Sequence, residues 1–494
     1  MTSQPEIIFS TDADRATLSR STARGTLVRL ARGIYSPLID TPAEIVIARN
    51  LWQIIGREFP GAVVVDRSAR HAGPVGGRLT VDHPRRRPVE LPGVVVVPAD
   101  RFGPVDGDMS LPGGIWLASV PRQLLDNLDR SRGWRSRAMA DDEIEAWIDS
   151  IVAEKGLEGL NKIRDEARRI APVLNRESQF VRLERIIGAT LGTADVTAVH
   201  STRLLSRALG EPYDARRVDL FDSLAENLMS HAPTVLPLNG SDTLRRRLLP
   251  FYEAYFSNYI EGTEFTLDEA AALIFDNVIP DGRPADAHDV RGTFDLVADG
   301  SEMRRRPGDS AELVALLLKR HLVLMGGRPE VHPGQFKSRA NRAGLTEFVA
   351  PDLVVGTLRR GFDSGRKVVS PFARAVFMMF LVAEVHPFTD GNGRLARIFM
   401  NAELVAADEA RIIIPTVLRN DYLMALRSVT HSANFAALYS VLDFARRWTA
   451  QVDFSSRTVA EQVLADTHAL RDANEAERLG IRLILPSTVA RPGY

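Results

Sequence analysis

The chain of 494 residues contains no cysteine. Disulfide bonds and thiolate metal sites are therefore excluded. The chain also lacks an apolar run of about 20 residues and a charged-then-apolar N-terminal segment, so neither a membrane span nor a signal peptide is predicted. The net charge of −1 gives no overall case for a nucleic-acid partner. We therefore expect a cytoplasmic bacterial protein of two or three domains.

The most informative segment is 386–397, which reads HPFTDGNGRLAR. Residues 371–385 before it are apolar on nearly every side and predict a helix buried in a domain core. Pro387 disfavours the helical conformation at His386, so the helix should end there. Residues 390–393 have the composition of a tight turn that tolerates positive φ. Helical spacing resumes after this turn, which predicts a helix, a turn and a second helix.

The side chains of this segment suit the binding of a nucleotide's phosphates. Arg394 and Arg397 share one face of a first helical turn, where free N–H groups and a partial positive charge attract anionic oxygens. Their guanidinium groups add bidentate donors. Asp390 is placed to hold a Mg²⁺ ion that bridges phosphate oxygens. His386 can accept a proton near neutral pH.

Other interpretations of this segment fit less well. A calcium loop would need oxygen ligands two and four residues before Asp390, where Phe388 and His386 stand. A P-loop would need Gly-x-x-x-x-Gly-Lys-Ser/Thr, and the segment contains no lysine. The remaining alternative is an ordinary turn with a core-packed histidine and two solvated arginines, which requires every element of the pattern to coincide by chance.

The segment resembles the Fic motif, His-x-Phe-x-Asp/Glu-Gly-Asn-Gly-Arg-x-x-Arg, and matches it at every specified position. The wider similarity to Fic domains runs over roughly 240–450. The resemblance implies transfer of AMP from ATP to a Ser, Thr or Tyr hydroxyl of a protein. It implies that His386 deprotonates the hydroxyl, that Asp390 binds Mg²⁺ and that Phe388 packs into the core. The residues implied in phosphate binding are Gly391, Asn392 and Gly393 for the α- and β-phosphates, and Arg394 and Arg397 for the β- and γ-phosphates.

Relatives that phosphorylate their targets depart from Gly-Asn-Gly and carry a lysine at the place of Gly393. This chain keeps both glycines, which favours nucleotidyl transfer.

A second segment, 244–262, has helical apolar spacing and ends at a glycine. Ser257 and Glu261 are four residues apart and share a face. With Gly262 they resemble the inhibitory motif Ser/Thr-x-x-x-Glu-Gly/Asn of Fic proteins that have an N-terminal inhibitory helix. The resemblance implies that Glu261 pairs with Arg397 and withholds it from the γ-phosphate. The same glutamate could instead position water that removes AMP from a modified protein.

Residues 334–351 lack a helical period and have turn residues at both ends. They resemble the hairpin flap that Fic domains use to hold a target backbone by strand addition. The alternative is an ordinary loop before the next helix.

The N-terminal region carries an uneven charge, because 15–37 contains five arginines and no acid. Its pattern predicts a short helix over 15–24, stopped by Gly25, and a hairpin over 26–36. This order resembles the wing of the abortive-infection antitoxin family of regulators, and strands at 62–65, 78–81 and 94–97 fit the same family. Only 14 residues precede the helix, so the winged helix is partial. A scaffold for protein contacts is therefore favoured over DNA binding.

The sequence as a whole predicts a multidomain, mainly α protein. The expected domains are a small α/β module with a partial winged helix and strands (1–120), a helical connecting region with helices at 143–151 and 178–187 (121–233), an all-α Fic domain with a β-hairpin flap (234–450), and a tail with a polar helix and a strand at 481–486 (451–494).

The favoured function is an autoinhibited protein adenylyltransferase that uses ATP and Mg²⁺. The alternatives are removal of AMP by the same site, and a DNA-binding regulator whose Fic domain senses a nucleotide. The expected partners are ATP and a protein substrate that can include the chain itself. A homodimer is compatible with the sequence, and no membrane partner is expected.

Overall fold

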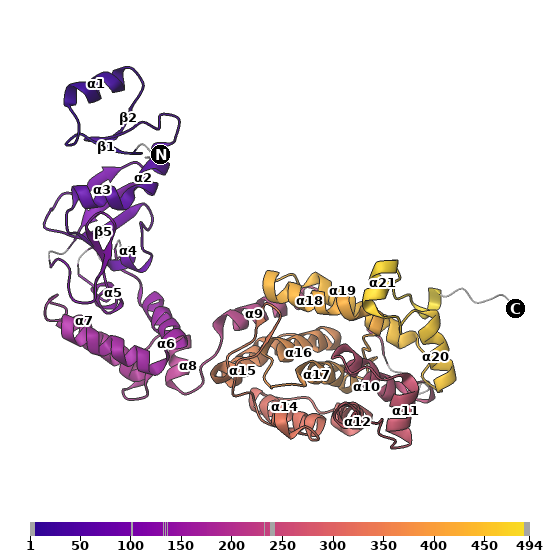
Figure 1. Cartoon of the computed structure of the whole chain (residues 1–494). Coiled ribbons are helices and arrows are strands. Elements are labelled where there is room, and N and C mark those ends of the chain that lie inside the picture. Colours follow the sequence, from indigo (N-terminus) through magenta and orange to yellow (C-terminus); the bar gives the residue numbers. More distant parts are fainter. Residues whose placement is uncertain are drawn as a thin grey trace. The chain divides into compact units, whose positions relative to one another are not determined.

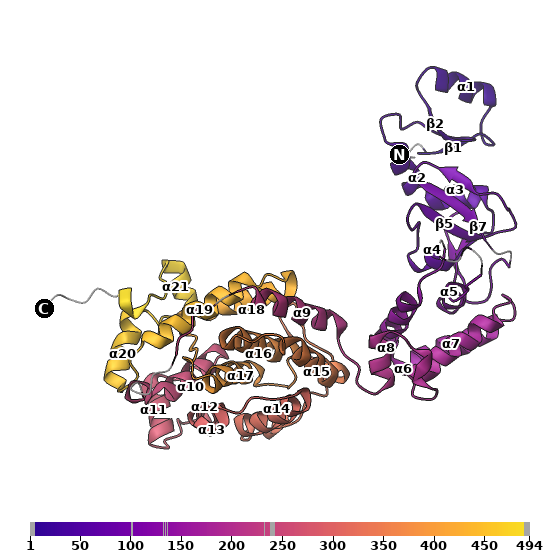
Figure 2. The same ribbon diagram turned by 180° about the vertical axis from the view of Figure 1, so that it is seen from behind.

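The computed structural model describes residues 5–99, 102–131, 133, 135, 137–231, 233–237 and 243–488. The chain divides into two compact units, residues 1–210 and residues 211–494. Figures 1 and 2 show the mixed α/β character of the first unit and the helical character of the second. The mainly α, multidomain fold that the sequence predicts is confirmed.

The first unit begins with a small antiparallel sheet in the order β1-β3-β2. Helix α1 (Arg15–Ala23) follows β1, and Gly25 then adopts a φ of 71°. The predicted helix and hairpin are therefore present. The strands of this sheet are β1 (Ile8–Phe9), β2 (Val28–Ala31) and β3 (Ile34–Ser36). Strand β1 precedes α1 in the described residues, and the resemblance to antitoxin regulators stays a prediction.

A mixed sheet in the order β6-β7-β5-β4-β9-β8 forms the centre of this unit. The pairs β5–β7 and β4–β9 are parallel, and the other neighbours are antiparallel. All three predicted strands occur in it. Its strands are β4 (Val63–Val64), β5 (Arg78–Asp82), β6 (Val89–Leu91), β7 (Val94–Pro98), β8 (Met109–Leu111) and β9 (Ile115–Leu117). Apolar side chains of the sheet and of α3 share one buried cluster.

The rest of the first unit is helical, and both helices predicted in it are present. The longest helix, α6, contains a break at Gly156, whose φ is 69°. The helices of the unit after α1 are α2 (Ala43–Arg49), α3 (Leu51–Glu58), α4 (Asp66–Arg70), α5 (Val120–Asn127), α6 (Asp141–Ile170), α7 (Glu177–Thr190) and α8 (Thr202–Ala208).

The second unit is built around two helices, α16 and α17, that pack closely against each other. In Figures 1 and 2, α12 and α14 lie on one side of this pair, and α18 and α19 lie on the other. Its helices are α9 (Ala215–Met229), α10 (Leu249–Ile260), α11 (Leu267–Phe275), α12 (Pro284–Ala298), α13 (Gly300–Met303), α14 (Ser310–Met325), α15 (Val354–Gly365), α16 (Pro371–Val385), α17 (Asn392–Ala406), α18 (Arg419–Ser432), α19 (Ala436–Gln451), α20 (Arg457–Asp466) and α21 (Ala473–Leu479).

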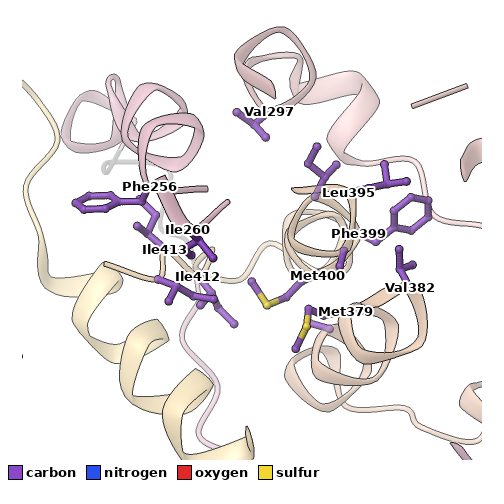
Figure 3. Close-up of a cluster of buried hydrophobic side chains, with 14 of the residues drawn as sticks. Phe256, Ile260, Val297, Met379, Val382, Leu395, Phe399, Met400, Ile412 and Ile413 are labelled. Atoms are coloured by element: carbon purple, nitrogen blue, oxygen red, sulfur yellow. The ribbon is translucent and has the colours of Figure 1, made fainter. Parts of the chain in front are cut away.

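Helix α16 has the bounds that the sequence predicts, while α17 begins at Asn392, two residues before Arg394. The predicted helix 244–262 is divided into a single turn at Leu244–Arg246 and α10. Pro250 stands in the first turn of α10, where its missing N–H costs nothing. Figure 3 shows how α10 joins the core, with Phe256 and Ile260 close to Ile412 and Ile413, and with Met400 of α17 near Met379 of α16.

The flap is present as the antiparallel hairpin β10 (Arg342–Ala343) and β11 (Thr346–Glu347). The predicted terminal strand is wrong, because 481–485 form neither helix nor strand. Ile481, Leu483 and Leu485 instead pack against the apolar core of the second unit. None of the described helices is long and apolar enough to cross a membrane.

The four predicted domains stay a prediction. The structure places α9, from the predicted connecting region, against α15 and α16 in the second unit. It also places apolar residues of α20 and α21, from the predicted tail, in the core of that unit.

Candidate active site

The loop after α16 carries His386 with a left-handed backbone, φ 52°. Helix α16 ends here because the following Pro387 disfavours a helical residue before it. The imidazole stacks on Phe348 of the flap, with ring centroids 3.8 Å apart. Its Nδ1 lies 3.2 Å from the carbonyl oxygen of Ala383 and is therefore the donor nitrogen, which leaves Nε2 as the nitrogen that can accept a proton. Burial lowers the pKa of His386 to about 4, so the ring is neutral at pH 7.

Arg397, on α17, is buried and is held by the inhibitory segment. Its Nη2 lies 2.7 Å from Oε1 of Glu261 and donates to the carbonyl oxygen of Ser257 at 2.7 Å. Its Nε donates to the hydroxyl of Ser257 at 3.0 Å. The contact that the inhibitory resemblance implies is thus present, and Ser257 contributes two further acceptors. Gly262 follows Glu261 with a φ of 93°, which suits a glycine.

Both glycines of the motif, Gly391 and Gly393, lie close to side chains of other segments. A Cβ on Gly393 would overlap the carboxylate of Glu261, so Glu261 occupies space directly against the loop that is expected to bind phosphate. Gly391 has a φ of 77°, and a Cβ there would meet the sulfur of Met325 at 2.9 Å. The positive φ disfavours an L side chain at Gly391, whereas a side chain at Gly393 would require the carboxylate of Glu261 to move.

Asn392 holds the shape of the loop through Phe388. Its side-chain oxygen accepts the N–H of Phe388 at 2.9 Å, and its Nδ2 donates to the carbonyl oxygen of Phe388 at 2.9 Å. The ring of Phe388 is fully buried, as predicted. The side chain of Asn392 thus acts on the loop, and the start of α17 presents its backbone N–H groups.

Arg394 is buried and faces an acid that lies about a hundred residues earlier in the sequence. Its Nη1 lies 2.5 Å from Oδ2 of Asp289 on α12 and donates to Asn258 on α10 at 3.3 Å. The Asp289 carboxylate also lies 3.2 Å from Arg328. Sequence reasoning missed Asp289, because one carboxylate in an ordinary helical stretch gives no local signal.

Asp390 is half-buried and already has cationic neighbours. Its Oδ2 accepts from Arg328 at 2.9 Å, and its Oδ1 lies 3.5 Å from Arg394. No group of three or more His, Asp or Glu side chains within the described ranges could hold a metal by itself. A single carboxylate nevertheless fits a Mg²⁺ ion that is bound mainly by the phosphates of a nucleotide and by water. Asp390 is the residue that would hold such an ion.

A cavity of about 200 Å³ connects the base, the phosphate loop and the flap. One end is lined by His386, Gly393, Arg397 and Glu261. The rest is lined mostly by the flap and α18, through Ala343, Thr346, Phe348, Tyr422, Leu423, Leu426, Arg427 and Thr430, and by Phe380, Ala383 and Glu384 of α16. This cavity was not predicted from the sequence, because its walls come from segments far apart in the chain.

Residues 312–404, which include this loop, match the family model described as the Fic/DOC family. This part of the chain is therefore similar to Fic domains. It is 26% identical over 208 residues to protein adenylyltransferase fic-1 of Caenorhabditis briggsae, covering 41% of this chain and 40% of that protein. It is 25% identical over 224 residues to protein adenylyltransferase Fic of Drosophila yakuba, covering 43% of each. The matched part thus spans about two fifths of the length of these relatives.

Solved structures of Fic proteins are also similar to this chain. The Fic-1 fragment 134–508 from C. elegans aligns with a TM-score of 0.37 and 17% identity, covering 63% of this chain and 96% of that one. A Fic domain containing signaling protein from Bacteroides thetaiotaomicron aligns with a TM-score of 0.36 and 18% identity, covering 48% of this chain and 96% of that one.

Proposed function

We propose that this protein is a protein adenylyltransferase that transfers AMP from ATP to a Ser, Thr or Tyr hydroxyl of a protein, and that Glu261 inhibits it. The observation that carries the proposal is the convergence of His386, Gly393, Arg397 and Glu261 on one cavity. The similarity of the Fic domain to proteins named adenylyltransferases supports the same reaction.

In the proposed reaction, Nε2 of His386 takes the proton of the target hydroxyl. The hydroxyl oxygen then attacks the α-phosphorus of ATP, the bond from that phosphorus to the bridging oxygen of the β-phosphate breaks, and pyrophosphate leaves. The N–H groups at the start of α17 and the guanidinium of Arg397 stabilise the negative charge on the phosphates. A Mg²⁺ ion held by Asp390 would neutralise charge on the same oxygens.

The inhibitory part of the proposal follows from the partners of Arg397. While Glu261 pairs with this arginine, the guanidinium is withheld from the γ-phosphate, and the carboxylate repels an anion beside Gly393. ATP would then bind in a position from which the α-phosphate is not attacked. Movement of Glu261 away from Arg397 would release the inhibition.

The experiment is label transfer by the Glu261→Gly protein from two labelled forms of ATP. Label should reach protein from ATP labelled at the α-phosphate and should not from ATP labelled at the γ-phosphate. Transfer of the γ-label would show phosphorylation and reject the proposal. The His386→Ala protein in the same background is the control for non-enzymatic labelling.

Removal of AMP is a second candidate, because Glu261 lines the same cavity as His386 and its side chain is one-third exposed. A carboxylate in this place can orient water toward the phosphorus of an AMP-modified hydroxyl. Labelled protein made with Glu261→Gly and then mixed with the wild-type protein would lose its label if removal occurs. If the label stays on the protein after the wild-type protein is added, the site does not remove AMP under these conditions.

A further inference from the structure

His321, on α14, is a fully buried histidine that the proposed reaction does not use. Its Nδ1 accepts the backbone N–H of Gly334, at the start of the flap segment, at 2.9 Å. A nitrogen that accepts an N–H carries no proton, so Nε2 is the protonated nitrogen and donates to the carbonyl oxygen of Asp390 at 3.1 Å. One neutral ring therefore joins the flap segment to the catalytic loop.

The same ring also packs against the motif. It stacks on Phe388, with ring centroids 3.7 Å apart and planes 5° apart. Phe388 is in turn fixed by Asn392 at both its N–H and its carbonyl group. His321 thus contacts the catalytic loop at a side chain and at a carbonyl group, two and four residues after His386.

A second connection between flap and loop runs through Asn341. Its Nδ2 donates to the carbonyl oxygen of Phe388 at 2.9 Å, and its Oδ1 accepts from the ammonium group of Lys337 at 2.6 Å. The backbone N–H of Lys337 donates to the carbonyl oxygen of Pro387 at 2.9 Å. Carbonyl groups of Pro387, Phe388 and Asp390 therefore all accept hydrogen bonds from outside the loop.

We propose that His321 and Asn341 form a latch, defined as these two residues, which holds the catalytic loop and the flap in one fixed relation. Both are positioning residues for His386. The flap supplies Phe348, which stacks on the imidazole of His386, and the loop supplies the backbone that carries that imidazole. When the two segments move together, Nε2 of His386 keeps its place relative to a hydroxyl that is held by the flap. A displacement of about 1 Å at this point can cost about 100-fold in rate.

This inference deepens the proposed function, but the latch can be tested without it. The first measurement is amide hydrogen exchange by mass spectrometry on the full chain, which needs no activity. His321→Leu replaces the imidazole with an apolar side chain and removes both hydrogen bonds. We expect exchange to become about tenfold faster in 334–349 and in 386–391 together, since two hydrogen bonds of ordinary strength are lost. The matched control is His332→Gln, because His332 is an exposed histidine in the same region.

Two further variants separate a latch from general packing. His321→Gln returns an amide donor near the place of Nε2 and should restore most of the protection in 386–391. Asn341→Ala changes a half-buried flap residue and should raise exchange in both segments without changing the thermal midpoint of unfolding by much. If His321→Leu fails to fold, Asn341→Ala decides the question. Faster exchange in one segment alone, or in neither segment, in His321→Leu or in Asn341→Ala would overturn the proposal.

The second measurement is the rate of label transfer from α-labelled ATP in the Glu261→Gly background. His321→Leu and Asn341→Ala should lower kcat by about tenfold or more and leave the Kd for ATP unchanged, because the phosphate contacts are intact. A loss of ATP affinity equal to the loss of kcat would contradict a positioning role. If the parent variant transfers no label, the proposed function fails, and the exchange measurement still decides the latch.

Discussion

Two buried arginines, Arg122 in the first unit and Arg397 in the second, have different kinds of acid partner. In the first unit, Arg122 is 1% exposed and lies 2.5 Å from Asp82, 2.7 Å from Asp108 and 3.6 Å from Asp126. These acids come from the sheet, a loop and the arginine's own helix, and Asp126 also lies 3.4 Å from Arg176. In the second unit, Arg397 has a single carboxylate partner among the described contacts, and that partner is one-third exposed at the edge of a cavity.

The difference separates a structural ion pair from an exchangeable one. A cation surrounded by three buried acids can lose a partner only by leaving a charge unpaired in the interior, which is strongly unfavourable. A cation that faces a cavity with one acid can exchange that acid for another anion, such as a phosphate. The pKa shifts do not distinguish the two arginines, because burial would lower the pKa of each and the neighbouring groups more than reverse that effect in both.

The largest expected effect is the loss of label transfer in a variant of the second unit that still folds. His386→Ala should reduce label transfer by about 10²–10⁴-fold, the usual loss of a general base. ATP binding should remain, because the residues that we propose to bind its phosphates are Arg394, Arg397 and the start of α17. Calorimetry of ATP binding with each protein checks this. If His386→Ala loses both ATP binding and label transfer, His386 has a structural role and is not a general base.

The next effect should appear only in the first unit. Arg122→Leu leaves Asp82, Asp108 and Asp126 close together without their shared cation, and should lower the free energy of unfolding of this unit by about 3–5 kcal/mol. Four of the five tryptophans lie in 1–210, so urea unfolding followed by tryptophan fluorescence reports mainly on this unit. Label transfer by the Glu261→Gly, Arg122→Leu protein should match that of Glu261→Gly at a temperature where both are folded. If the free energy of unfolding is the same in the wild-type and Arg122→Leu proteins, Arg122 is not the structural ion pair described above.

The pH profile of transfer sharpens the account of the second unit. The pKa of His386 is lowered to about 4, mainly by burial and also by Lys337, while the hydrogen bond to Ala383 and the charges of Glu261 and Asp390 act in the opposite direction. A base is active when neutral, so His386 stays active above this pKa and is lost as the pH falls through it. The rate of the Glu261→Gly protein should therefore change little from about pH 8 to about pH 5.5 on account of this residue. A midpoint near the ordinary histidine pKa of about 6.5 would show that the ring is solvated during the reaction.

The smallest effect concerns the exposed arginines of the first unit. Arg15, Arg20, Arg24 and Arg29 are exposed around α1 and β2, and they are not enclosed by acids as Arg122 is. We expect at most weak, salt-sensitive binding of duplex DNA, because a few phosphate contacts give affinity without reading bases. A mobility-shift titration at two salt concentrations measures it. Tight binding to one sequence at physiological salt would favour the regulator hypothesis.

The sequence predicts those features that depend on neighbouring residues. Helix α16 has the predicted bounds because Pro371 suits a helix start and Pro387 follows its end. The predicted strand at 481–486 is wrong although its apolar residues alternate, because alternation cannot show whether a strand edge is available. In the site, the motif residues come together around one cavity and a loop. Asp289, His321 and Asn341 were missed, because each contacts the motif from a distant segment and carries no local pattern.

The central claim is that Glu261 inhibits transfer by occupying Arg397, and two variants test it most directly. A charge-assisted pair in a partly buried site contributes about 1.5–3 kcal/mol. Its removal in Glu261→Gly should increase autoadenylylation by about 10–100-fold. Glu261→Gly with Arg397→Ala should show no such increase, because the released arginine is what binds the γ-phosphate. Equal stimulation in the single and double variants, measured as label transferred from α-labelled ATP, would contradict the account.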